Sequence, residues 1–558
     1  MSTTIATETA TEAPAAALPP AIELTGISKS FGAVRANHDI NLAVRPGTIH
    51  GIIGENGAGK STLMSILYGF YQADSGTIRM NGEAVTIADS QDAIDRGIGM
   101  VHQHFMLVEP FTVLENVMLG AEGAGLLNKG IGQARRELAR LESDYALEVD
   151  PDAVVGQLPV GLQQRVEILK ALYRGAEVLI LDEPTGVLTP AEADHLFRIL
   201  GTLRDQGKTI LLITHKLREI MAITDEVSVM RRGEMVATRT TSETSVAELA
   251  ELMVGRSVLL KVDKAPATPG DVKLSVRNLT VKDSRGVTVV DDVSFDVRAG
   301  EIVGIAGVAG NGQSEVLEAL SGIRPAQSGT VALEGREVLL SGGIADELRD
   351  RRLVHVPEDR HRLGLILDFS AWENAAFGYH HLEPASRGQI MDHRAMREDT
   401  KGKMERFDVR PPNPALHAKS FSGGNQQKIV LAREIERSPD LLLVGQPTRG
   451  VDIGAIEFIH QRIVELRDAG KAILLVSVEL DEIMSLSDRI AVMFDGRIMG
   501  ERLPKDTDER ELGLLMAGMD GRSNPTAAEI EASLDAAAAD MHGARPAGTG
   551  SDAIRQGG

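Results

Sequence analysis

The sequence predicts an α/β fold that occurs twice along the chain, each copy being a mainly parallel sheet covered by helices on both faces. Three observations lead to this prediction. A glycine-rich loop lies between a short apolar strand, residues 48–53, and a helix over residues 61–68. Short apolar strands then alternate with amphipathic helices, which is typical of a parallel sheet. Finally, the motifs of the first half recur in the same order in the second half, about 260 residues later.

The glycine-rich loop of the first half, the first phosphate loop, fits the pattern G-x-x-x-x-G-K-[ST]. It reads Gly54-Glu55-Asn56-Gly57-Ala58-Gly59-Lys60-Ser61-Thr62. Glycines let successive backbone N–H groups turn toward an anion, and a strand before the loop and a helix after it are the context in which this motif binds phosphate. Lys60 adds a positive charge for the outer phosphates, and the Ser61 hydroxyl is a suitable ligand for Mg²⁺.

Two acids follow an apolar strand at residues 178–181. Ligands of open α/β sheets bind at the carboxyl ends of strands. Asp182 is therefore predicted to hold Mg²⁺, and Glu183 to orient or deprotonate an attacking water. The alternative is that these acids only cap the next helix.

Three further segments carry polar groups in suitable places. His215 follows the strand at residues 209–213 and could contact a γ-phosphate and a water, or be structural. Gln103 follows another strand and could reach the Mg²⁺ shell, or belong to a surface turn. Ser422-Gly423-Gly424 opens a helix that is expected to run to about Glu436. A hydroxyl, free N–H groups and the helix dipole make an anion site there, although a plain N-cap explains the same residues.

The internal repeat sets the expected domain boundaries. Residues 307–314 (Gly-Val-Ala-Gly-Asn-Gly-Gln-Ser), the second phosphate loop, correspond to the first, and residues 421–427 correspond to residues 158–164. We expect a disordered tail at residues 1–21, a first domain at 22–256, a linker at 257–273, a second domain at 274–520 and a disordered tail at 521–558. In each domain a β-rich opening precedes the phosphate loop, and a polar helical stretch, residues 132–145 in the first, lies in the middle.

Composition excludes several classes of function. The formal charge is −21, so a nucleic-acid partner is not expected, because such a partner needs a basic surface. The chain has no cysteine, which excludes disulfides and thiolate chemistry. No apolar run approaches the roughly 20 residues of a membrane span, and the first 20 residues lack the basic and apolar regions of a secretory signal.

The order of these motifs, and their duplication, resembles the ATP-binding-cassette (ABC) ATPases over residues 22–520. The resemblance implies two P-loop NTPase cassettes, each with a mainly parallel core sheet, an antiparallel β subdomain and a helical subdomain, and it implies ATP and Mg²⁺ as ligands. Asn425 and residues 447–452 look like the tandem subunits of sugar and nucleoside importers. Residues 163–175 look most like the nucleoside branch, which works with a basic-membrane-protein-type lipoprotein receptor.

The family pairs its cassettes head to tail, which implies two composite ATP sites. Site one would combine the first phosphate loop, Gln103, Asp182, Glu183 and His215 with Ser422, Gly423 and Gly424 of the second half. In this resemblance Ser61, Gln103 and Asp182 hold Mg²⁺, Glu183 and His215 are catalytic, and Phe31 is positioned to stack on adenine, although it could equally be a core residue.

Site two would combine the second phosphate loop with residues 158–162 (Leu-Pro-Val-Gly-Leu), and it lacks most of the expected groups. The replacements are Gln313 for the lysine, Gly445 and Gln446 for the two acids, Val478 for the histidine, Glu358 for Gln103 and Pro159 for the serine. Pro159 offers neither a hydroxyl nor an N–H. We therefore predict that site two cannot hydrolyse ATP; binding without turnover stays open.

The resemblance also implies partners and a location. Two integral-membrane permeases, and a receptor acting through them, would complete an importer on the cytoplasmic face of the cell membrane. Residues 105–120 and 363–378 would lie beside the grooves that receive the permeases, or serve only as internal packing. The alternatives are a ribose- or galactose-type importer, a soluble tandem ATPase acting on ribosomes or DNA, and an exporter, which the lack of a fused membrane domain disfavours.

Overall fold

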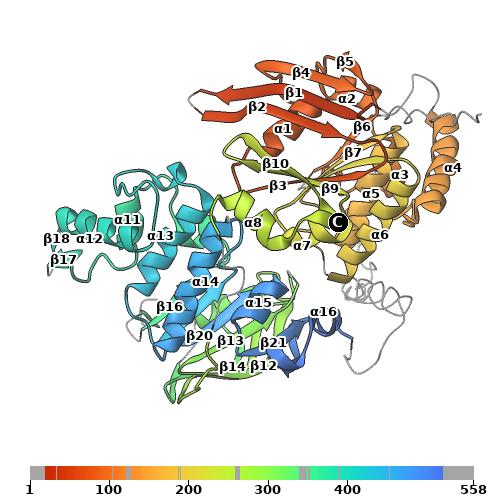
Figure 1. Cartoon of the computed structure of the whole chain (residues 1–558). Coiled ribbons are helices and arrows are strands. Elements are labelled where there is room, and N and C mark those ends of the chain that lie inside the picture. The colour runs from red at the N-terminus through yellow and green to blue at the C-terminus, as the bar shows by residue number, and fades with distance from the viewer. Residues whose placement is uncertain are drawn as a thin grey trace, which may run out of the picture.

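The computed structural model describes residues 19–519, apart from residues 33, 103–104, 121–126, 187, 189, 258–263, 309, 339–347, 350–351, 388–389 and 452. The chain forms two halves of similar architecture, drawn from red to yellow-green and from green to blue in Figure 1. Each half combines a four-stranded antiparallel sheet with a six-stranded, mainly parallel sheet. The predicted α/β fold with two copies is confirmed.

In the first half the antiparallel sheet has the order β2-β1-β4-β5 and the larger sheet the order β10-β9-β3-β8-β7-β6. The strands are β1 (Ile22–Phe31), β2 (Val34–Val44), β3 (Ile49–Gly54), β4 (Ser75–Met80), β5 (Glu83–Val85), β6 (Ile98–Val101), β7 (Val178–Asp182), β8 (Thr209–Ile213), β9 (Glu226–Arg231) and β10 (Glu234–Thr240). All pairings in the larger sheet are parallel except that of β10 with β9.

The larger sheet of the first half is buried on both faces. Successive residues of β7 point to opposite sides, so that Leu179 and Leu181 join one apolar core while Val178 and Ile180 join another. The apolar run of this strand is what a parallel sheet covered by helices requires. Because β7 and β8 are central, the polar residues that follow them emerge at one edge of the sheet.

Helices cover this sheet, and the helix expected at residues 61–68 is found one residue earlier, as α1. They are α1 (Lys60–Leu67), α2 (Ser90–Asp95), α3 (Val113–Met118), α4 (Leu127–Tyr145), α5 (Val160–Tyr173), α6 (Pro190–Asp205), α7 (Leu217–Ile223) and α8 (Val246–Val254). The expected polar helix at residues 132–145 starts five residues earlier, as α4.

The second half repeats this arrangement, with sheet orders β12-β11-β14-β15 and β16-β19-β20-β13-β21-β22. Its strands are β11 (Val272–Lys282), β12 (Thr288–Arg298), β13 (Glu301–Ala306), β14 (Ser328–Leu333), β15 (Arg336–Val338), β16 (Leu353–Val356), β19 (Leu441–Gly445), β20 (Ala472–Ser477), β21 (Arg489–Phe494) and β22 (Arg497–Arg502). A small hairpin, β17 (Ser386–Arg387) and β18 (Ile390–Met391), is added.

The described helices of the second half also follow the order of the first. They are α9 (Gln313–Leu320), α11 (Ala371–Ala376), α12 (His393–Arg406), α13 (Gly423–Ile435), α14 (Ile453–Asp468), α15 (Leu480–Leu486) and α16 (Glu509–Met516). A single π-helical turn, η3 (Arg360–Gly364), follows β16. Residues 529–541, for which the sequence suggests a helix within the C-terminal tail, lie outside the described residues, as do residues 1–18 and 521–558 of the two expected tails.

The two halves contact each other through equivalent elements. Helix α8, which ends the first half, packs on α14 of the second, and α16, which ends the second half, packs on α6 of the first. Figure 1 shows α8 beside α14 at the junction of the halves. Ile453 of α14 also packs against the apolar core of the first half. These reciprocal contacts give the chain a pseudo-twofold arrangement.

Opposite charges meet close to this pseudo-twofold axis. Lys216 lies 3.6 Å from Glu479, and Arg218 lies 2.7 Å from Asp481. By the repeat, each pair consists of two equivalent positions, which carry a basic residue in the first half and an acidic residue in the second. Two identical halves would place like charges here, so these pairs favour association of unlike halves.

The linker between the halves is anchored rather than merely exposed. Lys264 donates hydrogen bonds to the carbonyl oxygens of Leu486 and Ser487, at 2.7 and 2.6 Å, and lies 3.2 Å from Asp488. Three acceptors on the second half thus hold its ammonium group. Among the described residues, no helix is long and apolar enough to cross a membrane.

Candidate active sites

The first phosphate loop connects β3 to α1, and its glycines are required by the backbone. Gly57 and Gly59 have positive φ angles of 82° and 97°. A Cβ atom at Gly59 would lie 2.2 Å from the carbonyl oxygen of Ala36, which is closer than any real Cβ contact. The Asn37 side chain holds this turn by donating to the Gly59 carbonyl oxygen at 3.1 Å. Helix α1 starts directly after the loop, so its free N–H groups face the cradle.

Lys60 lies folded into this loop. Its ammonium group donates to the carbonyl oxygens of Gly54, at 2.7 Å, and Glu55, at 3.2 Å, and the residue is 6% exposed. Burial lowers the pKa of Lys60, and the negative charges of Glu183 and Asp182 oppose this effect. The Lys60 ammonium group is thus held in the phosphate loop, close to two acids, in a position suited to binding phosphate.

The two predicted acids emerge from the end of β7 and point to different partners. Asp182 is hydrogen-bonded to the Ser61 hydroxyl; burial and the charge of Glu183 raise the pKa of its carboxyl. Glu183 adopts a left-handed backbone, with φ 48°, and its N–H donates to Ile213 of β8 at 2.8 Å. This bond connects the ends of β7 and β8 and thereby aims the Glu183 side chain.

The side chain of Glu183 lies beside His215. The distance from Nδ1 of His215 to Oε1 of Glu183 is 2.9 Å. This hydrogen bond and the charge of His215, helped by Lys60, lower the pKa of the Glu183 carboxyl. Glu183 is therefore held in its ionised form, as a proton acceptor requires.

One contributing residue was missed from the sequence. Glu219 is buried on α7, and its carboxylate accepts hydrogen bonds from the hydroxyls of Thr185 and, at 3.0 Å, Thr214. It thereby joins the segments that follow Asp182-Glu183 and precede His215. A glutamate inside a short helix carries no sequence signal for this role.

The residues present fit a magnesium ion. The Ser61 hydroxyl and the Asp182 carboxylate already lie within hydrogen-bond distance of each other, and both are oxygen ligands that Mg²⁺ favours. The third predicted ligand, Gln103, lies outside the described residues. Phe31 is 43% exposed, and the centroids of its ring and the Tyr71 ring are 5.1 Å apart in a T-shaped arrangement. Phe31 is therefore a surface aromatic and not a core residue.

Ser422 begins helix α13 in the second half. Its hydroxyl accepts from the N–H of Asn425 at 3.4 Å and from the Asn425 side chain at 2.9 Å. The N-cap interpretation is therefore correct, and it leaves the N–H groups at Gly423 and Gly424, in the first turn, as potential anion ligands.

The first phosphate loop approaches this part of the second half. The Asn56 side-chain amide donates to the carbonyl oxygen of Val451 at 3.5 Å. The neighbouring Gly450 carbonyl oxygen lies 2.6 Å from the position that a Cβ atom on Gly423 would take. The fold thus brings together the phosphate loop of one half and the start of α13 in the other, which the sequence analysis predicts for site one.

The second phosphate loop keeps its backbone shape but exchanges its charges. Gly310 and Gly312 have φ angles of 94° and 96°, close to those of the first loop. Gln313 replaces the lysine, and its amide donates to the Val308 carbonyl oxygen at 2.6 Å, as the ammonium group does in the first loop. The hydrogen bond that stabilises the loop is kept, whereas the positive charge is lost.

Glu358 fills the space of the missing acid in the second half. Its carboxylate accepts from the Ser314 hydroxyl at 2.6 Å, an interaction like that of Asp182 with Ser61. A Cβ atom at Gly445 would lie 2.4 Å from Cγ of Glu358. Burial raises the pKa of the Glu358 carboxyl. The expectation that the metal-binding acid is simply absent is therefore refined, because a carboxylate from the segment after β16 stands beside Ser314.

The start of α5, which faces site two in the predicted pairing, differs from the start of α13. Pro159 occupies the N-cap position and makes no side-chain hydrogen bond there. A Cβ atom at Gly161 would lie 2.9 Å from Oε1 of Glu192. A carboxylate at this helix N-terminus disfavours a second anion.

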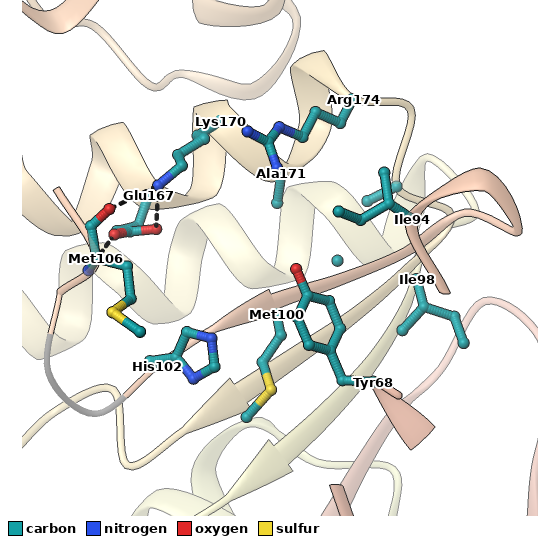
Figure 2. Close-up of a pocket in the computed structure, with 12 residues that line it drawn as sticks. Tyr68, Ile94, Ile98, Met100, His102, Met106, Glu167, Lys170, Ala171 and Arg174 are labelled. Carbon is teal, nitrogen blue, oxygen red and sulfur yellow. Dashed lines mark hydrogen bonds and ion pairs between the residues drawn. The ribbon is translucent and has the colours of Figure 1, made fainter. Parts of the chain in front are cut away.

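A groove lies beside the first-half site, between β6 and α5. Figure 2 shows Glu167 and Lys170 of α5 facing the backbone of Met106. Glu167 accepts from the Met106 N–H at 2.6 Å, and Lys170 donates to the Met106 carbonyl oxygen at 2.7 Å. The lining residues are Tyr68, Ile94, Ile98, Gly99, Met100, His102, Met106, Glu167, Lys170, Ala171, Arg174 and Ala176.

Several known proteins are similar in sequence to this chain over almost their full length. The ABC transporter family model matches residues 37–186 and 290–449. The nucleoside import ATP-binding protein NupA of Lactococcus lactis is 48% identical over 89% of this chain and 98% of its own length. The guanosine import ATP-binding protein NupO of Bacillus subtilis is 50% identical over 89% and 97%. A putative ribose/galactose/methyl galactoside import ATP-binding protein of Burkholderia lata is 41% identical over 88% and 96%.

The family match covers both halves, as the internal repeat requires, and the relatives align from end to end. Proteins of this kind bind ATP with Mg²⁺ and hydrolyse it, which agrees with the phosphate loop, the acids and the hydroxyl group described above. The chain therefore belongs to the ABC transporter family, as a tandem ATPase with two cassettes in one polypeptide.

Proposed function

We propose that this chain is the ATPase subunit of an importer that carries a nucleoside across the cell membrane through two separate permease subunits. The observation that carries the hydrolytic part is the cluster of Lys60, Asp182, Glu183 and His215 around one phosphate loop. The nucleoside is supported by two relatives that are named for nucleoside and guanosine import and match over nearly their full length.

In this proposal ATP is hydrolysed at site one. The loop N–H groups and Lys60 bind the phosphates, Ser61 and Asp182 hold Mg²⁺, and Phe31 stacks on the adenine ring. Bound Mg²⁺ neutralises charge on the phosphates. The oxygen of a water molecule forms a bond to the γ-phosphorus while Glu183 accepts a proton from that water. The bond between the γ-phosphorus and the oxygen that leaves with ADP breaks. The contact with His215 keeps the Glu183 carboxylate ionised, and the ionised form is the one that can accept a proton.

Site two is proposed to be non-hydrolytic. Gln446 cannot accept a proton as a carboxylate does, and Gln313 brings no charge to the phosphates. Glu358 leaves a carboxylate beside Ser314, so an oxygen pair remains for a metal while the catalytic base does not. One ATP would then be hydrolysed for each closure of the two halves.

The groove of Figure 2 is the proposed contact with one permease. It opens beside His102 and Met106, which follow β6, and the neighbouring strand β7 ends at Asp182. Glu167 and Lys170 attach α5 to the Met106 backbone, so a rotation of α5 would move the groove wall. Closure at site one would thereby change the position of the permease. A receptor would deliver the solute, and the chain would work at the cytoplasmic face of the membrane.

Uptake measurements test whether the transported solute is a nucleoside. A strain lacking this chain should lose uptake of labelled nucleosides and keep uptake of labelled ribose. Loss of ribose uptake alone would favour the monosaccharide importer, which the Burkholderia relative supports. Purification of the tagged chain from membranes should recover two hydrophobic permeases. Sedimentation with ribosomes and not with membranes would contradict the proposal.

A further inference from the structure

Arg360 lies at the start of helix α13, although it belongs to the π-helical turn η3 after β16. Its Nη2 atom is 2.7 Å from the position that a Cβ atom on Gly423 would take. Nη1 donates to the carbonyl oxygen of Arg449 at 2.7 Å, and Nε donates to Oε1 of Gln426 at 3.3 Å. Glycine at position 423 is therefore what allows the guanidinium group to reach this helix end.

Within the described part of the chain, the guanidinium group makes no ion pair there, and the acid whose charge acts on it is the preceding residue, Asp359. Among the described residues, no carboxylate lies within ion-pairing distance of Arg360, and the acceptors that it does have are neutral oxygens. The adjacent Asp359 instead caps η3, accepting from the N–H groups of His361 and Arg362 at 2.9 and 3.1 Å. Burial lowers the pKa of Arg360, but an arginine stays charged in a protein.

Two positive features thus coincide without an anion between them. The first is the N-terminus of α13, where backbone N–H groups point outward. The second is the half-buried charge of Arg360. Burying an unpaired charge costs free energy, and a phosphate group bound at this end would offset that cost.

The first phosphate loop is the source of such a phosphate. Arg360 binds the carbonyl oxygen of Arg449, and Val451, two residues further on, accepts from Asn56 of the loop at 3.5 Å. Nη2 of Arg360 is also 3.5 Å from the position of a Cβ atom on Gly450. The Arg360 guanidinium group therefore lies close to the first phosphate loop. The turn at residues 449–451 contacts both.

The equivalent helix end of the first half carries the opposite charge. At the start of α5, a Cβ atom at Gly161 would approach Oε1 of Glu192 at 2.9 Å. The cation is therefore found at the helix end near the complete phosphate loop, and an anion at the helix end that the predicted pairing assigns to the degenerate one. This difference favours a role in nucleotide binding over a general role in shaping η3.

We propose that Arg360 binds the γ-phosphate of the ATP held by Lys60 of the other half, and that this bond forms as the halves close. The inference rests on the proposed composite site one. Arg360 is then a phosphate-binding residue that favours binding of ATP over ADP, because ADP lacks the γ-phosphate.

The charge of the γ-phosphate provides the test. Binding of ATP, ADP and the γ-fluoro analogue of ATP, which has one negative charge fewer on the γ-phosphate, is measured with Mg²⁺ in the full-length Glu183→Gln protein. Added Arg360→Gln should weaken ATP binding about 10- to 100-fold, the usual range for one charge-assisted hydrogen bond. It should weaken binding of the fluoro analogue much less and leave ADP binding unchanged. Arg362→Gln, two residues along the same turn, is the matched control and should change none of the three.

Equal weakening of ATP and fluoro-analogue binding would overturn the inference, because a residue that only shapes η3 does not sense the γ-phosphate charge. If Arg360→Gln does not fold, Arg360→Lys serves, and it should keep the preference for ATP over the analogue. The Ser422→Ala variant distinguishes failure of the proposed composite site one from failure of the proposed role of Arg360. If it lowers ATPase activity while Arg360→Gln leaves the preference for ATP intact, composite site one stands and only the role of Arg360 fails.

Discussion

Nδ1 of His215 lies 2.9 Å from Oε1 of Glu183, and this contact lowers the pKa of the only carboxylate that we assign as a base. At the equivalent positions the second half has Gln446 and Val478, which cannot make such a pair. This difference sets the first prediction.

Glu183→Gln should lower kcat for ATP hydrolysis about 10²- to 10⁴-fold, because general-base catalysis contributes that much, while bound ATP is retained. Gln446→Glu should leave kcat within about twofold, since the second loop still lacks its lysine. Steady-state ATPase assays with labelled ATP retained on the protein measure both effects. Full activity in Glu183→Gln would refute the assignment of the base.

Ser422→Ala should reduce ATP hydrolysis at a phosphate loop that belongs to the other half of the chain. The lost hydroxyl removes one phosphate ligand, so a fall in kcat/KM of roughly 10- to 100-fold is expected. Pro159→Ser, the matched change at the start of α5, should not raise the activity, because Glu192 and Gln313 remain. A gain of activity in Pro159→Ser would mean that site two is limited by that serine alone.

Gly445→Asp should destabilise the second half instead of repairing it. The new Cβ atom would lie 2.4 Å from Cγ of Glu358, an overpacking that costs about 1–3 kcal/mol. Adding Glu358→Ala removes that Cγ atom and should recover most of the loss. Denaturant unfolding of the two single variants and the double variant forms a thermodynamic cycle, and additive effects would show that the residues do not share the space.

The sequence predicted much of the fold because local patterns specify it. The apolar run of β7 and the loop from Gly54 to Lys60 have strong signals within a few residues of chain. The family resemblance implied a site shared between the halves, and the contact of Asn56 with Val451 places the first phosphate loop beside the second half.

The remaining features depend on contacts between distant residues, which no local pattern encodes. The packing of Glu358 against Gly445 joins the segment after β16 to the end of β19, and its cause is the space left by a missing side chain. The approach of Arg360 to Gly423 depends on how η3 crosses the start of α13. The packing of α8 and α16 on the opposite halves depends on how the halves associate, which periodicity within one helix does not determine.

The contact of Asn56 with Val451 allows a direct test of the central claim, that one ATP site is shared between the halves. The chain has no cysteine, so Asn56→Cys with Val451→Cys introduces a single pair of thiols. Under mild oxidation the pair should form a disulfide within one chain, faster with ATP in a Glu183→Gln background. In the pair with Glu183 retained, ATPase activity should stop on oxidation and return on reduction. A pair that never crosslinks within the chain, with or without ATP, would contradict the account.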